Sequence, residues 1–250
     1  MSTSDNKLTF LLLHGAWCDA RAWRGVARRL KRAGHDVHAP TIMGHGPDAD
    51  PSATVDDAIA SIVAYVEDND LDNVVLVGHS LGGYYATHVA PRIAERLSRV
   101  VFLNAFVPSP GECIYDLVPA GAAAFFRTAT SDAGWISQPF ERVRDLYLAT
   151  MDAKTARGVY DEMSPQHDVA FTTLADNGDF YRMLTTTGAI SVSYVDFTGD
   201  IVMGPAGWYA AFADRLGPGV RVMRHEGGSH LVNYTNPKET AEALVQVGRV

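Results

Sequence analysis

Residues 74–83, Val-Val-Leu-Val-Gly-His-Ser-Leu-Gly-Gly, constrain the fold of this chain more than any other segment. A β-branched run of strand length is followed directly by Gly-x-Ser-x-Gly and then by a helix-compatible stretch that begins at Leu81. This order is typical of a strand–turn–helix elbow, which lifts the serine hydroxyl above the edge of a sheet. Gly78 and Gly82 carry no Cβ, so neighbouring backbone can approach them closely. We therefore predict that Ser80 is a nucleophile. A glycine-rich turn whose serine only caps a helix is the structural alternative.

Length and charge limit the class of protein. The 250 residues suit one large α/β domain, or a core with an inserted subdomain. The formal net charge of −8 disfavours nucleic acid and anionic membrane surfaces as partners. No apolar stretch approaches the length of a membrane span, and the first residues do not resemble a signal peptide. Cys18 and Cys113 form neither a disulfide framework nor a metal spacing. We expect a cytoplasmic protein.

Apolar runs of strand length alternate with segments of helical periodicity, which predicts a parallel sheet covered by helices on both faces. Strands are expected at 8–13, 36–39, 73–77, 99–104, 191–197 and 220–224. Helices are expected at 21–33, 55–68, 81–97, 205–216 and 237–247. Thr54 and Asn236 are typical of helix starts, the second because Pro237 follows it, and Gly34 is typical of a helix stop.

The stretch from 108 to 188 interrupts this rhythm. It is rich in aromatic residues and has helix-like patches at 120–128, 139–151 and 165–175, but no convincing buried strand. An unstructured loop of this length is implausible in a compact domain. We predict a helical cap over the carboxyl edge of the sheet, inserted into a core formed by residues 1–107 and 189–250.

A serine hydroxyl needs an adjacent base, normally an imidazole that is held by a carboxylate. His230 lies in a glycine-rich loop after the last expected strand, where the chain order Ser–Asp–His places the base. Asp200 follows the preceding expected strand and is the predicted acid. Asp196, inside that strand, is the alternative, because strand ends are read only to within a few residues.

Acyl transfer also develops negative charge on the substrate carbonyl oxygen, which aligned backbone N–H groups stabilise. The amide of Leu81, directly after the nucleophile, is one predicted donor. The loop after the first strand, His14-Gly15-Ala16-Trp17, supplies the other, with the Ala16 amide as the best candidate. We interpret His14 as a structural imidazole that fixes this loop.

Other motifs do not indicate a cofactor. His35 and His38 share one expected strand, but no third ligand follows at metal spacing, so we predict no metal site. The chain contains neither Gly-x-Gly-x-x-Gly nor a Walker loop, and no nucleotide cofactor is implied.

Four motifs together resemble the α/β-hydrolase superfamily: His-Gly-Ala-Trp at 14–17, Gly-His-Ser-Leu-Gly-Gly at 78–83, Thr-Gly-Asp at 198–200 and Gly-Gly-Ser-His at 227–230. The resemblance covers nearly the whole chain outside the insertion. It implies the α/β-hydrolase fold, with a mostly parallel sheet of about six strands, flanking helices and a helical cap.

More narrowly, the chain resembles the small esterase branch that includes plant salicylate and jasmonate methylesterases, hydroxynitrile lyases and related bacterial esterases. The first expected strand, 8–13, lies close to the start of the sequence, and the loop after it runs from His14 to a second tryptophan, Trp23. The tail 227–239 is similar to that of the branch. The hydroxynitrile lyases place a threonine and a lysine where this chain has Gly15 and Leu231. Because Leu231 makes the pocket less cationic, it argues against cyanohydrin cleavage.

The leading hypothesis is therefore a cofactor-free serine esterase that cleaves small carboxylic esters through an acyl-enzyme. The predicted pocket is lined by Trp17, Tyr84, Phe126, Trp135 and Leu231. A lactone or thioester hydrolase, or a hydroxynitrile-lyase-like enzyme, would use the same triad. A ligand-binding receptor that retains the pocket is the alternative from another class. The expected partner is a small-molecule ester, and a homodimer is left open.

Overall fold

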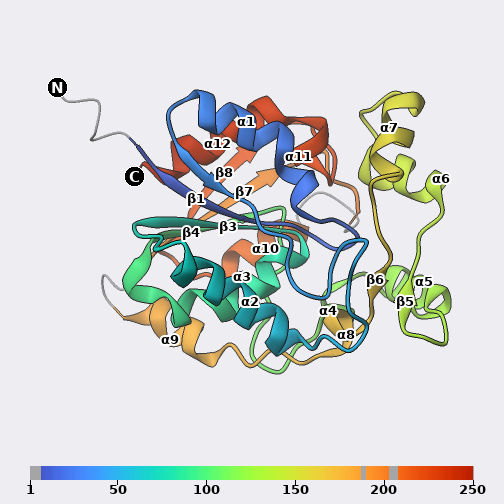
Figure 1. The fold of residues 1–250 in the computed structure, drawn as a ribbon, viewed down its shortest axis with the longest axis horizontal. Helices are drawn as coiled ribbons and strands as arrows, with labels where there is room; N and C mark the ends of the chain where they lie inside the picture. Colours follow the sequence, from blue (N-terminus) through green and yellow to red (C-terminus); the bar gives the residue numbers. More distant parts are fainter. Residues whose placement is uncertain (1–6, 187–189, 203–207, 250) are drawn as a thin grey trace.

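The computed structural model describes residues 7–186, 190–202 and 208–249. Its centre is a six-stranded sheet in the order β2-β1-β3-β4-β7-β8, in which every neighbouring pair is parallel (Figure 1). The strands are β1 (Thr9–Leu13), β2 (Asp36–His38), β3 (Val74–His79), β4 (Leu97–Leu103), β7 (Ser191–Phe197) and β8 (Arg221–His225). All six expected strands are confirmed to within two residues at each end, as is the predicted fold class.

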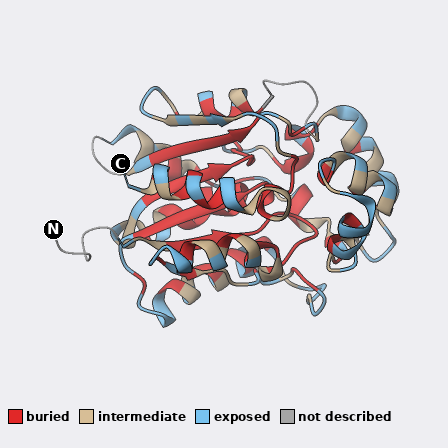
Figure 2. Cartoon of the chain, turned by 90° about the horizontal axis from the view of Figure 1, so that it is seen from above, coloured by how far each residue is buried: buried red, intermediate tan, exposed pale blue. Residues whose placement is uncertain are grey.

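Alternation along the strands sorts their side chains onto two faces. Phe10 and Leu12 of β1 join the cluster under α1 (Arg24–Arg32) and α12 (Pro237–Gly248), whereas Leu11 and Leu13 join the cluster on the opposite face. Figure 2 shows that the inner strands are almost entirely buried, and β1, β3, β4 and β7 are the mostly buried ones, whereas the edge strands β2 and β8 are partly exposed. A parallel sheet covered on both faces explains why the inner strands are nearly continuous apolar runs.

The opposite face is covered by α2 (Val55–Asp68), α3 (Leu81–Arg92), α9 (Gly178–Thr185) and α10 (Trp208–Asp214). Thr54 starts α2 as predicted, because its hydroxyl accepts a hydrogen bond from the Asp57 amide and the Asp57 carboxylate caps Thr54 in return. Gly34 follows α1 with φ +91°, which confirms the predicted stop. Asn236 precedes α12 with Pro237 in its first turn, but its side chain caps no amide of that helix.

Two helix predictions need correction at their ends, and a third is observed in the part that the structure describes. The segment 21–33 divides into a 3₁₀ turn (Ala20–Trp23) and α1. The segment 81–97 ends earlier, because Pro91 lies in the last turn of α3, and a 3₁₀ turn (Ala94–Arg96) then leads directly into β4. The expected helix 205–216 is observed as α10, while residues 203–207 lie outside the described part of the chain.

The insertion gathers at one end of the sheet (Figure 1). Its elements are α4 (Ile114–Leu117), α5 (Ala120–Ala129), β5 (Trp135–Ile136), α6 (Phe140–Arg142), a π-helical turn (Val143–Tyr147), α7 (Ala153–Tyr160), β6 (Gln166–His167) and α8 (Val169–Thr172). The expected helix 120–128 is confirmed, and 139–151 is only partly helical. The expected helix 165–175 is wrong: it divides into β6 and α8, and β6 pairs antiparallel with β5. Strands of two residues are too short to leave an alternating pattern.

The helix α9 packs against α3, beside the sheet. The division into a core and a cap spanning 108–188 stays a prediction. Across residues 7–186, 190–202 and 208–249, no helix combines the length and the apolar character that crossing a bilayer requires.

Candidate active site

Ser80 occupies a strained turn between β3 and α3. Its backbone has φ 53° and ψ −120°, a conformation that non-glycine residues rarely adopt. A Cβ on Gly78 would lie 2.5 Å from the carbonyl oxygen of Gly82, and a Cβ on Gly82 would lie 2.6 Å from the carbonyl oxygen of Leu13. Only glycine fits at both positions, so the turn can be tight enough to project the Ser80 hydroxyl beyond the edge of the sheet, toward His230.

Backbone hydrogen bonds hold this conformation. The Ser80 amide donates to the carbonyl of Leu103 at 3.3 Å. The Ser80 carbonyl accepts from the amides of Gly83 at 3.0 Å and Phe106 at 3.1 Å. The end of β4 therefore fixes the strained residue from the neighbouring strand.

His230 lies between Ser80 and Asp200 and contacts both. Its Nε2 is 2.9 Å from the Ser80 Oγ, and its Nδ1 is 2.6 Å from the Asp200 Oδ2. Ser80, Asp200 and His230 are 5%, 4% and 3% exposed. The structure thus brings together the three residues that the sequence predicted, from the ends of β3, β7 and β8.

Asp200 is surrounded by donors. Its Oδ2 also accepts from the Asn104 side-chain amide at 2.9 Å, and its Oδ1 accepts from the Val202 amide at 3.0 Å. The Tyr209 hydroxyl lies beside this carboxylate, 3.1 Å from the His230 Nδ1. Burial alone would raise the pKa of Asp200, but His230 and the interactions with Val202 and Tyr209 outweigh it and lower the pKa. An ionised Asp200 accepts a hydrogen bond from the Nδ1–H of His230, which leaves Nε2 unprotonated and able to accept the proton of Ser80.

The alternative acid, Asp196, has a different environment. It lies within β7, and its Oδ2 is 3.4 Å from the Nε of Arg224 on β8. Burial raises the pKa of Asp196, with Arg224 opposing the shift. The carboxylate that contacts His230 is that of Asp200.

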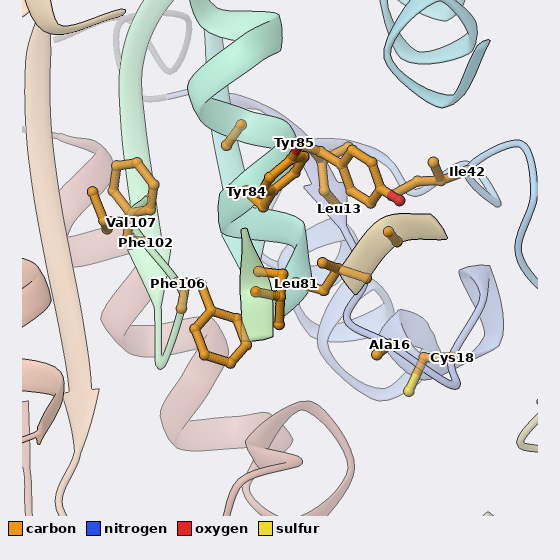
Figure 3. Close-up of a cluster of buried hydrophobic side chains, with 14 of the residues drawn as sticks. Leu13, Ala16, Cys18, Ile42, Leu81, Tyr84, Tyr85, Phe102, Phe106 and Val107 are labelled. Carbon is orange, nitrogen blue, oxygen red and sulfur yellow. The ribbon is translucent and has the colours of Figure 1, made fainter. Parts of the chain in front are cut away.

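The two predicted oxyanion donors lie on either side of the elbow. Leu81 begins α3, where backbone amides have no partner within the helix. A Cβ on Gly15 would lie 2.9 Å from the Cβ of Ser80, so the loop that contains Ala16 passes directly beside the nucleophile. Figure 3 shows Leu81 at the start of α3 and Ala16 on the loop after β1, within one cluster of buried side chains. Within the described part of the chain, neither amide donates to another backbone group outside regular elements.

Two further buried histidines are neutral and structural. The Nε2 of His14 accepts from the Ile42 amide at 3.1 Å, so its Nδ1 carries the proton and donates to the Gly15 carbonyl at 3.0 Å. Burial lowers the pKa of His14 to about 4. His79 donates through Nε2 to the carbonyl of His230 at 2.9 Å, and burial lowers its pKa to about 3. His14 thus supports the first loop, and His79 supports the loop of the candidate base.

A cavity opens next to Ser80 and His230. The residues that line it are Ala16, Trp17, Ser80, Phe106, Val118, Ala122, Phe126, Arg142, Tyr147, Phe171, Val202 and His230. Five of them are the predicted Ser80, His230, Ala16, Trp17 and Phe126. Most of the rest come from the insertion, which therefore forms one wall of the cavity.

Three of the predicted pocket residues do not line this cavity. The Tyr84 hydroxyl donates to the Thr173 carbonyl at 3.2 Å within the core. The Trp135 ring packs edge-on against His167, with centroids 4.9 Å apart. Leu231 is 2% exposed, and its amide donates to the carbonyl of Tyr147 at 3.1 Å. Leu231 therefore helps to hold the insertion next to His230.

Sequence reasoning missed Asn104, Arg142, Tyr147, Phe171 and Tyr209. Asn104 had a signal, since it is the polar residue that ends an apolar strand at the carboxyl edge of the sheet. The other four lie on helices, turns or loops whose place above Ser80 depends on tertiary structure. The sequence pattern held no signal for them.

Known proteins resemble this chain in sequence and in structure. A model of the alpha/beta hydrolase family matches residues 10–243. The carbendazim hydrolyzing esterase of Nocardioides sp. (strain SG-4G) is 42% identical over 113 residues, which are 44% of this chain and 47% of that protein. Methylesterase 7 of Arabidopsis thaliana is 23% identical over 97% of each chain. The predicted resemblance to methylesterases and bacterial esterases is confirmed.

Among solved structures, an extracellular α/β-hydrolase from a Paenibacillus species is similar over 97% of this chain and 100% of its own. The two share 30% sequence identity, with a TM-score of 0.90. That protein is described as sharing structural and functional homology with tobacco salicylic acid binding protein 2. From the family match and this likeness, the chain belongs to the α/β-hydrolase family.

Proposed function

We propose that this protein is a carboxylic ester hydrolase with Ser80 as nucleophile, His230 as general base and Asp200 as the carboxylate that orients it. One observation carries the proposal. A hydrogen-bonded relay joins the Ser80 Oγ, both nitrogens of His230 and the Asp200 carboxylate, and it faces a cavity. The names of the relatives, an esterase and a methylesterase, support the same reaction class.

The reaction follows from this relay. His230 takes the Ser80 proton through Nε2 as the oxygen attacks the ester carbonyl, and Asp200 stabilises the resulting imidazolium. The amides of Ala16 and Leu81 donate to the oxyanion. His230 then protonates the leaving alcohol, which departs. Water, deprotonated by His230, attacks the acyl-enzyme and releases the acid, and the proton returns to Ser80.

The lining of the cavity indicates the kind of ester. Aromatic and aliphatic side chains dominate it, which favours small esters with an apolar acyl group. Arg142 is the cationic side chain in this lining. Its guanidinium lies 4.1 Å from the centre of the Phe125 ring, and its Nε donates to the Gln138 Oε1 at 3.1 Å.

A labelling experiment tests the assignment. An organophosphonate should modify Ser80 and no other residue, as read by mass spectrometry of peptides. Ser80→Ala should remove both labelling and ester turnover while the protein stays folded. Ser193→Ala is the matched control, because Ser193 is also a buried serine but lies within β7, where its Oγ accepts from Arg99. Label at another residue, or full turnover by Ser80→Ala, would overturn the proposal.

A panel of neutral esters, lactones, thioesters and cyanohydrins then separates ester hydrolysis from the other reactions that the same relay allows. A lyase should cleave the cyanohydrins and leave the esters nearly untouched.

The cytoplasmic location stays a prediction. The Paenibacillus relative is described as extracellular.

A further inference from the structure

Trp17, the residue after the candidate oxyanion donor Ala16, has an unusual backbone. Its φ is +59°, in the left-handed region that a bulky aromatic residue rarely adopts. Such a conformation persists only where the surroundings hold it. The contacts of Trp17 therefore indicate what keeps the loop after β1 in place. We call residues 14–18 the oxyanion loop.

All three polar groups of Trp17 bind the insertion. Its amide donates to the Gln166 Oε1 at 3.3 Å, and its carbonyl accepts from the Ser164 amide at 3.1 Å. Its indole Nε1 donates to the carbonyl of Ile136 at 2.9 Å. The partners lie 119 to 149 residues away in sequence, on or next to the β5–β6 pair.

The side chain of Gln166 is fixed in the orientation that this contact needs. It is 2% exposed, and its Nε2 donates to the carbonyl of His167 at 3.1 Å. Because the amide nitrogen is held by that carbonyl, the oxygen is the end that faces the Trp17 amide. Ile136 pairs with Gln166 across the two strands, so the partners of the Trp17 amide and indole move as one unit.

We propose that Gln166 is a positioning residue for catalysis, and that the β5–β6 pair holds the oxyanion loop in its productive geometry. The proposal rests on the proposed function. Gln166 fixes the peptide that joins Ala16 to Trp17, and the Ala16 amide belongs to the peptide directly before it. Without the Gln166 oxygen, the Trp17 N–H is left without that acceptor and the strained φ relaxes. The Ala16 donor then turns away from the position of the oxyanion.

The decisive measurement compares an oxoester with the matching thionoester, in which sulfur replaces the carbonyl oxygen. Donors that are aligned on the oxyanion favour oxygen over sulfur, so the ratio of the two kcat values reports their alignment. Gln166→Met keeps the length of the side chain and removes the acceptor. We expect the oxoester kcat to fall about tenfold while KM stays within about twofold. Because the thionoester kcat should fall less, the oxoester-to-thionoester ratio of kcat should be several-fold lower than in the wild type.

Asn177→Leu is the matched control. Asn177 is also a buried amide of the 108–188 segment, 1% exposed, and its Nδ2 donates to the Thr87 Oγ1 and the Pro108 carbonyl, far from the oxyanion loop in sequence. A change that only reduces the amount of folded enzyme lowers both rates equally. The control should therefore leave the oxoester-to-thionoester ratio unchanged.

Trp17→Phe provides a second test that keeps Gln166. It removes the hydrogen bond to Ile136 but retains an aromatic ring, and it should lower the ratio by a smaller factor. An unchanged ratio in folded Gln166→Met overturns the proposal. If that variant does not fold, Gln166→Leu, which also lacks the acceptor, is measured in its place, and an unchanged ratio there overturns the proposal. A wild-type protein without ester turnover or Ser80 labelling would instead refute the proposed function.

Discussion

The sheet with its strand-end turns and the inserted segment differ in how they hold their side chains. In the first, Ser80, Asp200 and His230 follow three strands and are at most 5% exposed. In the second, most elements are one or two turns of helix or two-residue strands, and many residues are exposed (Figure 2). Strand ends next to one another in a sheet place side chains with little freedom. Short elements that pack mainly through aromatic rings hold their side chains less firmly, so their residues can be replaced more easily.

The reacting groups and most of the cavity wall therefore come from different parts of the chain. The candidate relay belongs to the sheet, whereas Val118, Ala122, Phe126, Tyr147 and Phe171 of the insertion form much of the cavity wall. A substitution in the first region should change the rate of the chemical step or the stability. A substitution in the cavity wall of the second should change which esters are accepted, whereas Gln166, which contacts the oxyanion loop, is expected to change the rate.

Asp200→Asn should give the largest effect within the sheet region. An amide at this position no longer favours the tautomer of His230 that accepts the Ser80 proton, so kcat should fall about 10⁴-fold. Steady-state kinetics on a neutral ester measure it. Asp196→Asn is the control, because that side chain faces Arg224, and its kcat should change only slightly. Equal losses in the two variants would contradict the assignment of the acid.

Acid should destabilise the sheet region through its buried neutral histidines. In the folded protein the pKa of His14 is about 4 and that of His79 about 3, below the unfolded value of 6.5. The unfolded chain therefore binds more protons as the pH falls below 6.5, and stability is lost. As the pH falls from about 6.5 to 5, each of these histidines lowers the free energy of unfolding by about 2 kcal/mol. Urea unfolding at pH 7 and pH 5 checks this, and equal free energies would contradict it.

Glycine-to-alanine substitutions compare the packing of the two regions directly. In Gly78→Ala the new methyl meets the Gly82 carbonyl oxygen at 2.5 Å, which should destabilise the fold by about 3 kcal/mol. Gly158, inside α7 of the insertion, has open space where a Cβ would be. Gly158→Ala should stabilise that helix by up to about 1 kcal/mol. Thermal unfolding measures both, and a loss of stability at Gly158 equal to that at Gly78 would show that the two regions are packed equally tightly.

Arg142→Met should change specificity with the smallest effect on the reaction itself. The guanidinium can hydrogen-bond an acidic group on the acyl chain, so KM for an ester of that kind should rise about tenfold. KM for the neutral ester, and kcat for both, should stay within about twofold. Arg144→Met is the control, since Arg144 is ion-paired with Asp145 and does not line the cavity. Equal changes in KM for the neutral and the acidic ester would show that Arg142 of the insertion does not distinguish between the two substrates.

The two regions also differed in how far the sequence predicted them. The elbow and the six strands were predicted because Gly78, Gly82 and the apolar runs leave local signals. Asp200 and Asp196 could not be separated by pattern alone, since the choice depends on which carboxylate reaches His230. The β5–β6 pair was missed because two residues show no period. Gln166 and Tyr209 act through contacts with residues that are distant in sequence, and no local pattern records those contacts.

The position of Trp17 also makes it an optical reporter. Its ring lines the cavity and lies 5.3 Å from the ring centre of Phe126 and 5.6 Å from that of Phe171. Any molecule that enters the cavity alters the polarity around this indole, so its fluorescence follows occupancy without an added label. The other three tryptophans, Trp23, Trp135 and Trp208, add a background signal, and Trp23, which is 0% exposed on the other face of the sheet, is remote from the cavity.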